Sequence, residues 1–95
     1  MPPDVLDAPK VVSETQNKLD DVWELIMWND DVHSFLYVIV ALMQICGHTK
    51  ELAERLANEV HNEGKAIVEV GDKETLQKYK DQLQELQLTV EIQRI

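Results

Sequence analysis

Residues 22–31 read Val-Trp-Glu-Leu-Ile-Met-Trp-Asn-Asp-Asp. Residues 22–28 are mostly apolar and rich in strand formers, so they predict a largely buried β-strand. Asn29, Asp30 and Asp31 prefer turns because their side chains bond nearby backbone groups, so the strand is expected to end there. Functional residues often lie where a strand passes into a loop, which makes these three candidate site residues.

A helix is expected to follow this acidic turn. Ser34 can cap its N-terminus, and Gly47 is a natural residue for its C-terminal end. The side opposite its expected core face is apolar too, through Leu36, Val40 and Met43, so the helix must be covered on nearly all sides or leave an apolar patch. The expected core face has helical spacing and consists of Phe35, Val38, Ile39, Leu42, Ile45 and Cys46.

The remaining residues predict two more helices and two more strands. Thr49 can cap a second helix that ends at Gly64, and residues 65–70 predict a second strand. Asp72 can cap a third helix, and residues 88–93 alternate between apolar and polar, the period of a half-buried strand. This order predicts an α+β fold, a two-layer β-α-α-β-α-β domain with three helices packed on one face of a three-stranded sheet.

The length of 95 residues bounds the chain to one domain. Residues 1–21 contain Pro2, Pro3 and Pro9 and follow no regular period, so we expect a flexible N-terminal extension before a folded core at residues 22–95. The formal net charge of −9 argues against nucleic-acid binding, because such a surface repels phosphate backbones. It favours a cationic group or a basic patch on a protein partner, although the same charge also serves solubility.

Export, membrane insertion, metal binding and catalysis are not expected. No apolar run approaches the roughly 18 residues that cross a bilayer, and no export signal marks the N-terminus. Cys46 is the only cysteine, which suits a reducing cytoplasm, and its place on the apolar stripe indicates packing rather than catalysis. His33, His48 and His61 lack the close spacing of a zinc motif with Cys46 or with one another. We expect a cytoplasmic monomer without metal, cofactor or enzyme activity.

Asn29, Asp30, Asp31 and His61 are the residues best suited to binding chemistry. His61 directly follows the apolar stripe of the second helix, so its meeting with the acidic turn would place a polar cluster beside an apolar cavity. Such a cluster suits a primary ammonium, which offers three donors and needs acceptors around it. A free α-amino group, with a pKa of about 7.7–8.0, is mostly protonated at neutral pH. Taken alone, the turn also fits a plain loop and the histidine a structural role.

Two separated segments resemble the ClpS family: residues 28–31, Trp-Asn-Asp-Asp, and residues 60–66, Val-His-Asn-Glu-Gly-Lys-Ala. In that family a strand ends in an Asn-Asp-Asp turn, and a later helix ends in Val-His followed two residues on by Gly-Lys-Ala. The resemblance covers residues 22–95 and implies a fold similar to the C-terminal domain of the ribosomal stalk protein. It also implies an adaptor that binds N-degrons and delivers them to a AAA+ Clp unfoldase-protease.

The resemblance implies roles for individual residues. Asn29, Asp30 and His61 would bond the α-amino group and first peptide unit of a substrate, and Asp31 would support that loop. Six residues match family positions around the cavity for the first side chain: His33, Phe35, Val38, Ala57, Val60 and Leu86.

A second surface is implied for docking on the unfoldase. Glu74 matches a position that docks on the N-terminal domain of ClpA-like unfoldases. A basic partner is expected five positions later, where this chain has Tyr79, so Lys78 or Lys80 is expected to substitute. The segment before Val22 resembles the family extension that engages the unfoldase during delivery.

Three departures from the family pattern bear on which first residue is preferred. His33 stands where many members have threonine, Phe35 replaces a common methionine at the cavity entrance, and Ala57 replaces another methionine of the wall. Such volume changes shift selectivity by about 1–3 kcal/mol without changing the mode of binding. We expect large apolar first residues (leucine, phenylalanine, tyrosine or tryptophan), with an altered preference that includes basic ones as the alternative.

Two functions from other classes compete with this reading. A general protein-interaction domain would use the same fold and the apolar first helix, and its binding would not depend on the N-terminal residue of the partner. A metal-assisted hydrolase would use Asp30, Asp31 and His61, and would need a stoichiometric ion.

Overall fold

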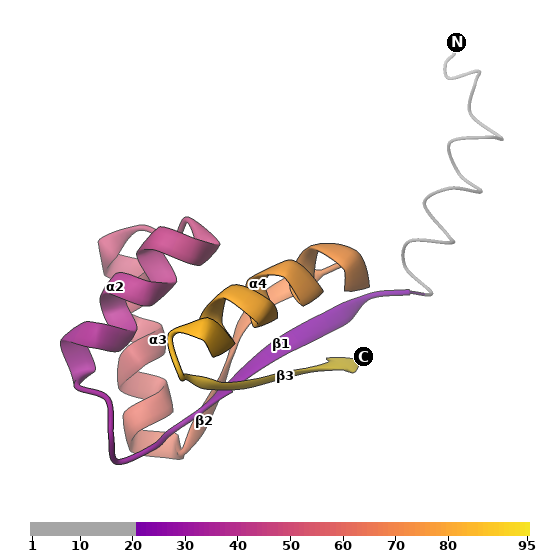
Figure 1. The fold of residues 1–95 in the computed structure, drawn as a ribbon. Coiled ribbons are helices and arrows are strands. Elements are labelled where there is room, and N and C mark those ends of the chain that lie inside the picture. Colours follow the sequence, from indigo (N-terminus) through magenta and orange to yellow (C-terminus); the bar gives the residue numbers. More distant parts are fainter. Residues whose placement is uncertain (1–20) are drawn as a thin grey trace, which may run out of the picture.

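The computed structural model describes residues 21–95, and it confirms the predicted α+β class and order of elements (Figure 1). Of the expected extension over residues 1–21, only Asp21 lies within the described residues. The elements in chain order are β1 (Trp23–Trp28), α2 (Phe35–Cys46), α3 (Lys50–Glu63), β2 (Lys65–Gly71), α4 (Lys73–Glu85) and β3 (Thr89–Arg94).

The helices begin at the polar residues that the sequence indicates. The side chains of Ser34, Thr49 and Asp72 each accept a hydrogen bond from a backbone N–H in the first turn of α2, α3 and α4. Helices α2 and α3 end at Gly47 and Gly64, whose φ angles of 73° and 90° suit glycine because it has no Cβ. These caps fix where the loops around the candidate site begin.

The three strands form an antiparallel sheet in the order β2-β1-β3, with β1 in the centre. Ile26 lies opposite Ile67 on one side and Glu91 on the other. The pairing with β2 shifts by one residue between Leu25 and Ile26, which marks a β-bulge. Because side chains alternate along a strand, Leu25 and Met27 face one side of the sheet, and Ile26 and Trp28 face the other.

The hydrophobic core lies between the sheet and the helices. Leu25 and Met27 are fully buried, as are Leu42 of α2 and both Leu76 and Leu83 of α4. Figure 1 shows α4 running along the sheet, while α2 and α3 pack together at the end where β1 leads into the acidic turn. Full burial of each such side chain contributes about 1.5–3 kcal/mol to folding. The core therefore holds the helices firmly against the sheet.

Helix α2 presents an apolar outer side, one of the two outcomes that its sequence allows. Leu36 is 66% exposed, and Val40 and Met43 are exposed beside it. No helix of the described part is both long and apolar enough to cross a membrane.

Candidate functional site

The loop between β1 and α2 is organised around the carboxylate of Asp30. Its Oδ1 accepts hydrogen bonds from the backbone N–H groups of Val32 and His33, each at 2.9 Å. The Nδ1 atom of His33 lies 3.0 Å from Oδ2, and it is the donor because an ionised carboxylate only accepts. One side chain therefore satisfies three donors of its own loop and sets its shape.

These bonds also keep Asp30 ionised. Partial desolvation raises its pKa, but the hydrogen bonds from His33 and Val32 outweigh that effect and hold the pKa below the ordinary value of 3.8. At neutral pH the loop therefore carries a fixed negative charge. Asp31, the next residue, is exposed, and its side chain is not among those that line the nearby cavity.

A stacked pair of rings supports the loop from the side of α2. The imidazole of His33, whose side chain is only 11% exposed, stacks on the ring of Tyr37 with centroids 4.7 Å apart. The Tyr37 hydroxyl donates a hydrogen bond to the carbonyl of Leu86 at 2.9 Å. The side chain of Tyr37 thus links α2 both to the loop and to the end of α4.

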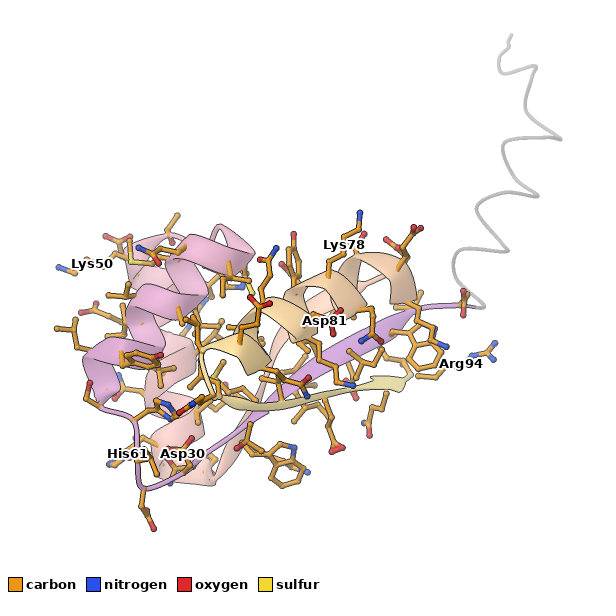
Figure 2. The ribbon with its side chains drawn as sticks, viewed as in Figure 1. Asp30, Lys50, His61, Lys78, Asp81 and Arg94 are labelled. Atoms are coloured by element: carbon orange, nitrogen blue, oxygen red, sulfur yellow. The ribbon has the colours of Figure 1, made fainter. Side chains whose placement is uncertain are left out.

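The structure brings the acidic turn and the end of α3 together. The backbone N–H of Asn29 donates to the carbonyl of Gly64 at 2.9 Å, which ties the end of β1 to the C-terminus of α3. Figure 2 shows Asp30 and His61 at this same end of the molecule. A small cavity between the turn, α2 and α3 is lined by Asn29, His33, Ser34, Phe35, Val38, Ala57, Val60 and His61.

The cavity is nearly closed in this conformation. Its volume is about 20 Å³, enough for one or two water molecules and far too small for a large side chain. Phe35 lies at the first turn of α2 and is 41% exposed, so it is the lining residue best placed to move outward. Ala57 and Val60 are buried in the wall from α3.

Seven of the predicted site residues line this cavity, and three others lie elsewhere. Asp30 does not line the cavity itself, but its carboxylate is hydrogen-bonded to His33, which does. Asp31 is exposed on the loop. Leu86 is not among the lining residues but lies half-buried at the end of α4, where its carbonyl binds Tyr37. The seven that line it are Asn29, His33, Phe35, Val38, Ala57, Val60 and His61.

Two residues of the site have roles that the sequence analysis missed. Ser34 lines the cavity as well as capping α2. Tyr37 supports His33, and the signal was its position four residues after His33, which places the two rings on one side of a helix start.

The residues expected to dock on an unfoldase lie on α4, away from the cavity. Glu74 and Lys78 border a shallow hollow of about 510 Å³ at the start of α4, together with Asp21 and Asp72. Lys80 does not line this hollow. Both signs of charge are therefore presented there, on a rigid helix.

The described residues do not provide a metal site or an activated thiol. Within residues 21–95, no group of three or more histidine, cysteine, aspartate or glutamate side chains is placed to hold an ion. Burial, together with the nearby charge of Glu69, raises the pKa of the Cys46 thiol to about 12, so it stays protonated at neutral pH. Cys46 therefore packs, partly buried, against the core, and its sequence position indicates such packing.

Comparison with known proteins identifies the family. The profile of the family described as ATP-dependent Clp protease adaptor protein ClpS matches residues 18–91. The chain belongs to the ClpS family. A protein of Nostoc named ATP-dependent Clp protease adapter protein ClpS is 39% identical over 84 residues, which cover 87% of each chain.

Other relatives match over a shorter span. The protein of the same name from Mycobacterium tuberculosis is 36% identical over 58 residues, which is 61% of this chain and 57% of the relative's length. The chain thus spans little more than half the length of this relative. The family name describes an adaptor, which agrees with the expectation that the chain is not an enzyme.

A solved structure shows the same fold. Agrobacterium tumefaciens ClpS2 bound to L-phenylalaninamide superposes with a TM-score of 0.70 and covers 80% of this chain and 99% of its own. At 18% identity this likeness concerns the fold alone, and it agrees with the three-stranded sheet and three helices described above.

Proposed function

We propose that this protein is a non-enzymatic adaptor that binds the free N-terminus of a protein substrate and delivers that substrate to a AAA+ Clp unfoldase-protease. The observation that carries the proposal is the meeting of Asn29, His61 and the Asp30 loop around a small cavity that is also lined by apolar side chains of α2 and α3. The family to which the chain belongs supports the proposal, because it is described as an adaptor of the Clp protease.

The polar rim supplies what an α-ammonium group needs. Asp30 contributes an ionised carboxylate, Asn29 an amide oxygen and His61 a ring nitrogen, and all three belong to the end of the molecule where the cavity opens. Charge-assisted hydrogen bonds of this kind are stronger than neutral ones, and a nearby carboxylate favours the protonated amine. An internal or acetylated chain segment offers neither the charge nor the three donors.

The cavity favours a large apolar first residue over a basic one. Four of its lining residues, Phe35, Val38, Ala57 and Val60, offer no side-chain acceptor for a cation, and an unpaired buried charge is costly. Admission of a leucine or phenylalanine side chain requires the cavity to widen, and outward rotation of Phe35 provides the space. The binding of L-phenylalaninamide by the Agrobacterium protein supports a ligand with a free amine and an apolar side chain.

Delivery requires a second contact, which we place on α4. Glu74 and Lys78 place charges of opposite sign around one hollow, and Lys80 lies on the same helix. Simultaneous binding of substrate and unfoldase raises the effective concentration of one for the other. Cys46 has a free, half-buried thiol, which supports the proposal that the protein acts in the reducing cytoplasm.

The decisive test is binding to two peptides that differ only at the terminal amine. A peptide that begins with phenylalanine should bind, and its N-acetylated form should bind at least about a hundredfold more weakly, since several charge-assisted bonds are lost. Fluorescence anisotropy with a C-terminal dye measures both. Asp30→Ala should lower affinity for the free peptide, while Asp31→Ala, which changes net charge equally, is the matched control.

The outcomes separate the competing functions. Equal binding of the free and acetylated peptides would contradict N-terminal recognition and favour a general interaction domain. A series that varies only the first residue, including lysine and arginine, then decides between apolar and basic preference.

A further inference from the structure

The second face of the sheet carries apolar surface although no described helix covers it. Ile26 points to this face from the central strand and is only 5% exposed. Its partner Ile67 on β2 is 47% exposed, and Trp28 is also exposed on this face. A strand with one solvated face normally places polar residues there, so an apolar centre on this face calls for an explanation.

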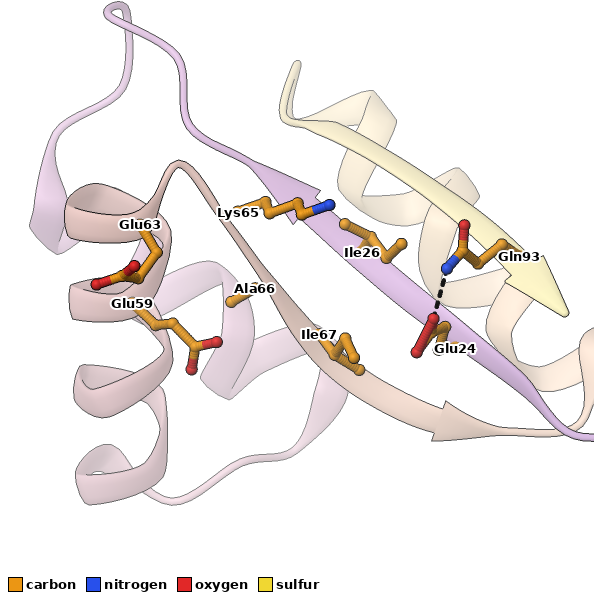
Figure 3. Close-up of a pocket in the computed structure, with 8 residues that line it drawn as sticks. All are labelled: Glu24, Ile26, Glu59, Glu63, Lys65, Ala66, Ile67 and Gln93. Atoms are coloured by element: carbon orange, nitrogen blue, oxygen red, sulfur yellow. Dashed lines mark hydrogen bonds between the residues drawn. The ribbon is translucent and has the colours of Figure 1, made fainter. Parts of the chain in front are cut away.

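A groove of about 390 Å³ runs across this face (Figure 3). Ile26 and Ile67 form its floor, and Glu59 and Glu63 of α3 form one wall. Figure 3 shows the Glu59 side chain projecting from α3 toward β2. At the other side of the groove, the Nε2–H of Gln93 donates a hydrogen bond to Glu24 at 2.6 Å, which holds that carboxylate in place.

The charges around the groove are unbalanced. Three glutamates line it against one lysine, Lys65. The Lys65 ammonium lies 4.9 Å from the ring centroid of Trp28, so an aromatic face already holds this cation. Among residues 21–95, no cation forms an ion pair with Glu59 or Glu63. The groove therefore combines an apolar floor with available negative charge on its walls.

We propose that this groove binds a short segment of a partner protein in which basic side chains flank an apolar one. The apolar side chain covers Ile26 and Ile67, and the flanking cations reach Glu59 and Glu63 on one wall and Glu24 on the other. Opposite charge on the two surfaces favours encounter and fixes the register of the segment. The groove and the cavity share no lining residue, so binding at the groove can be tested separately from N-terminal recognition.

The test uses a short peptide with one leucine between flanking lysines, acetylated at its N-terminus and amidated at its C-terminus. The acetyl group keeps the peptide out of an α-ammonium site, so its result does not depend on the proposed adaptor function. Amide chemical shifts of the full chain should change around Ile26, Lys65 and Ile67. A peptide with glutamates in place of lysines, or glycine in place of leucine, should produce much smaller changes.

Two double variants distinguish the groove from general charge attraction. Glu59→Gln/Glu63→Gln should weaken peptide binding roughly fivefold, since two surface ion pairs are removed. Asp81→Asn/Glu85→Gln has the same spacing and charge change on α4, outside the groove, and should weaken binding less than about twofold. Urea denaturation checks that both variants remain folded.

Three results would overturn the proposal. Equal weakening by the two double variants would mean diffuse attraction to an acidic protein. Absence of any shift change with the lysine peptide would mean that the groove does not bind this chemistry. Self-association of the wild-type chain that Ile67→Lys abolishes would mean that the face is an interface between two copies.

Discussion

The cavity beside the acidic turn and the groove on the open sheet face solve different binding problems. The cavity holds about 20 Å³, and its rim is fixed by the hydrogen bonds of Asp30. The groove holds about 390 Å³ and is the more open of the two, and its carboxylates stand on α3 and on one strand, β1. Volume alone would rank the groove above the cavity. Fixed acceptors around a small cavity are better suited to a chain end, because the cost of ordering them is met during folding.

The largest expected difference between the two regions is their tolerance of added volume. Ala57→Met adds side-chain atoms to a buried wall that has almost no free space, so it should lower the free energy of unfolding by about 1–3 kcal/mol. Ile67→Phe adds the same number of side-chain heavy atoms to the open groove and should change it by less than about 0.5 kcal/mol. Urea denaturation of each variant measures both.

A second substitution sharpens this prediction. Phe35 and Ala57 line the same cavity, so Phe35→Met combined with Ala57→Met should recover part of the loss, with a coupling free energy of about 0.5–3 kcal/mol. Additive effects would show that Phe35 does not occupy the space that the methionine needs. Equal costs at Ala57 and Ile67 would contradict the contrast between a site with almost no free space and a spacious one.

The next effect concerns the charge that organises the cavity rim. Asp30→Asn should lower the free energy of unfolding at pH 7 by about 1 kcal/mol. The carboxylate is partly exposed, and water screens the hydrogen bonds by which it orders the loop, so its contribution to stability is small. The folded-state pKa of Asp30 is depressed, so its contribution is complete above the unfolded pKa and is lost as the pH falls through the folded value. The difference in the free energy of unfolding between wild type and Asp30→Asn should therefore disappear only below about pH 4.

Stability of both proteins in urea at several pH values between neutrality and acid measures this gap. Asp31→Asn changes the net charge equally and provides the control. A gap that persists unchanged into strong acid would show that the asparagine disturbs the loop for reasons other than charge.

The sequence predicted the fold well because its local signals agree with one another. Ser34, Thr49 and Asp72 cap the helices, and Gly47 and Gly64 end two of them, as their positions indicated. The meeting of Asn29 with the end of α3 depends on strand pairing across the sheet, and the two motifs of the family were the only sign of it in the sequence.

Other features of the site depend on side-chain packing and had no local signal. The contact between His33 and Asp30 arises from the loop conformation, and the near closure of the cavity depends on how Phe35 packs. The groove was not foreseen, because the bulge after Leu25 and the position of α3 beside β2 decide which side chains share the open face. Composition indicated only that a basic partner was favoured.

The smallest expected effect compares one hydrogen bond near each region. Tyr37→Phe removes the bond to the Leu86 carbonyl and should cost about 0.5–1 kcal/mol, because this bond joins α2 to the end of α4 across elements that no ladder connects. Gln93→Ala removes the bond to Glu24 and should cost less than about 0.5 kcal/mol, since β1 and β3 are already paired at that position.

Tyr37→Leu removes the ring stacked on His33 as well, so it should destabilise the protein more than Tyr37→Phe does. It should also shift the His33 ring resonances, which Tyr37→Phe should leave nearly unchanged. If Tyr37→Phe and Tyr37→Leu behaved alike in urea denaturation and in the NMR spectrum, the stacked ring would play no part in holding the cavity rim.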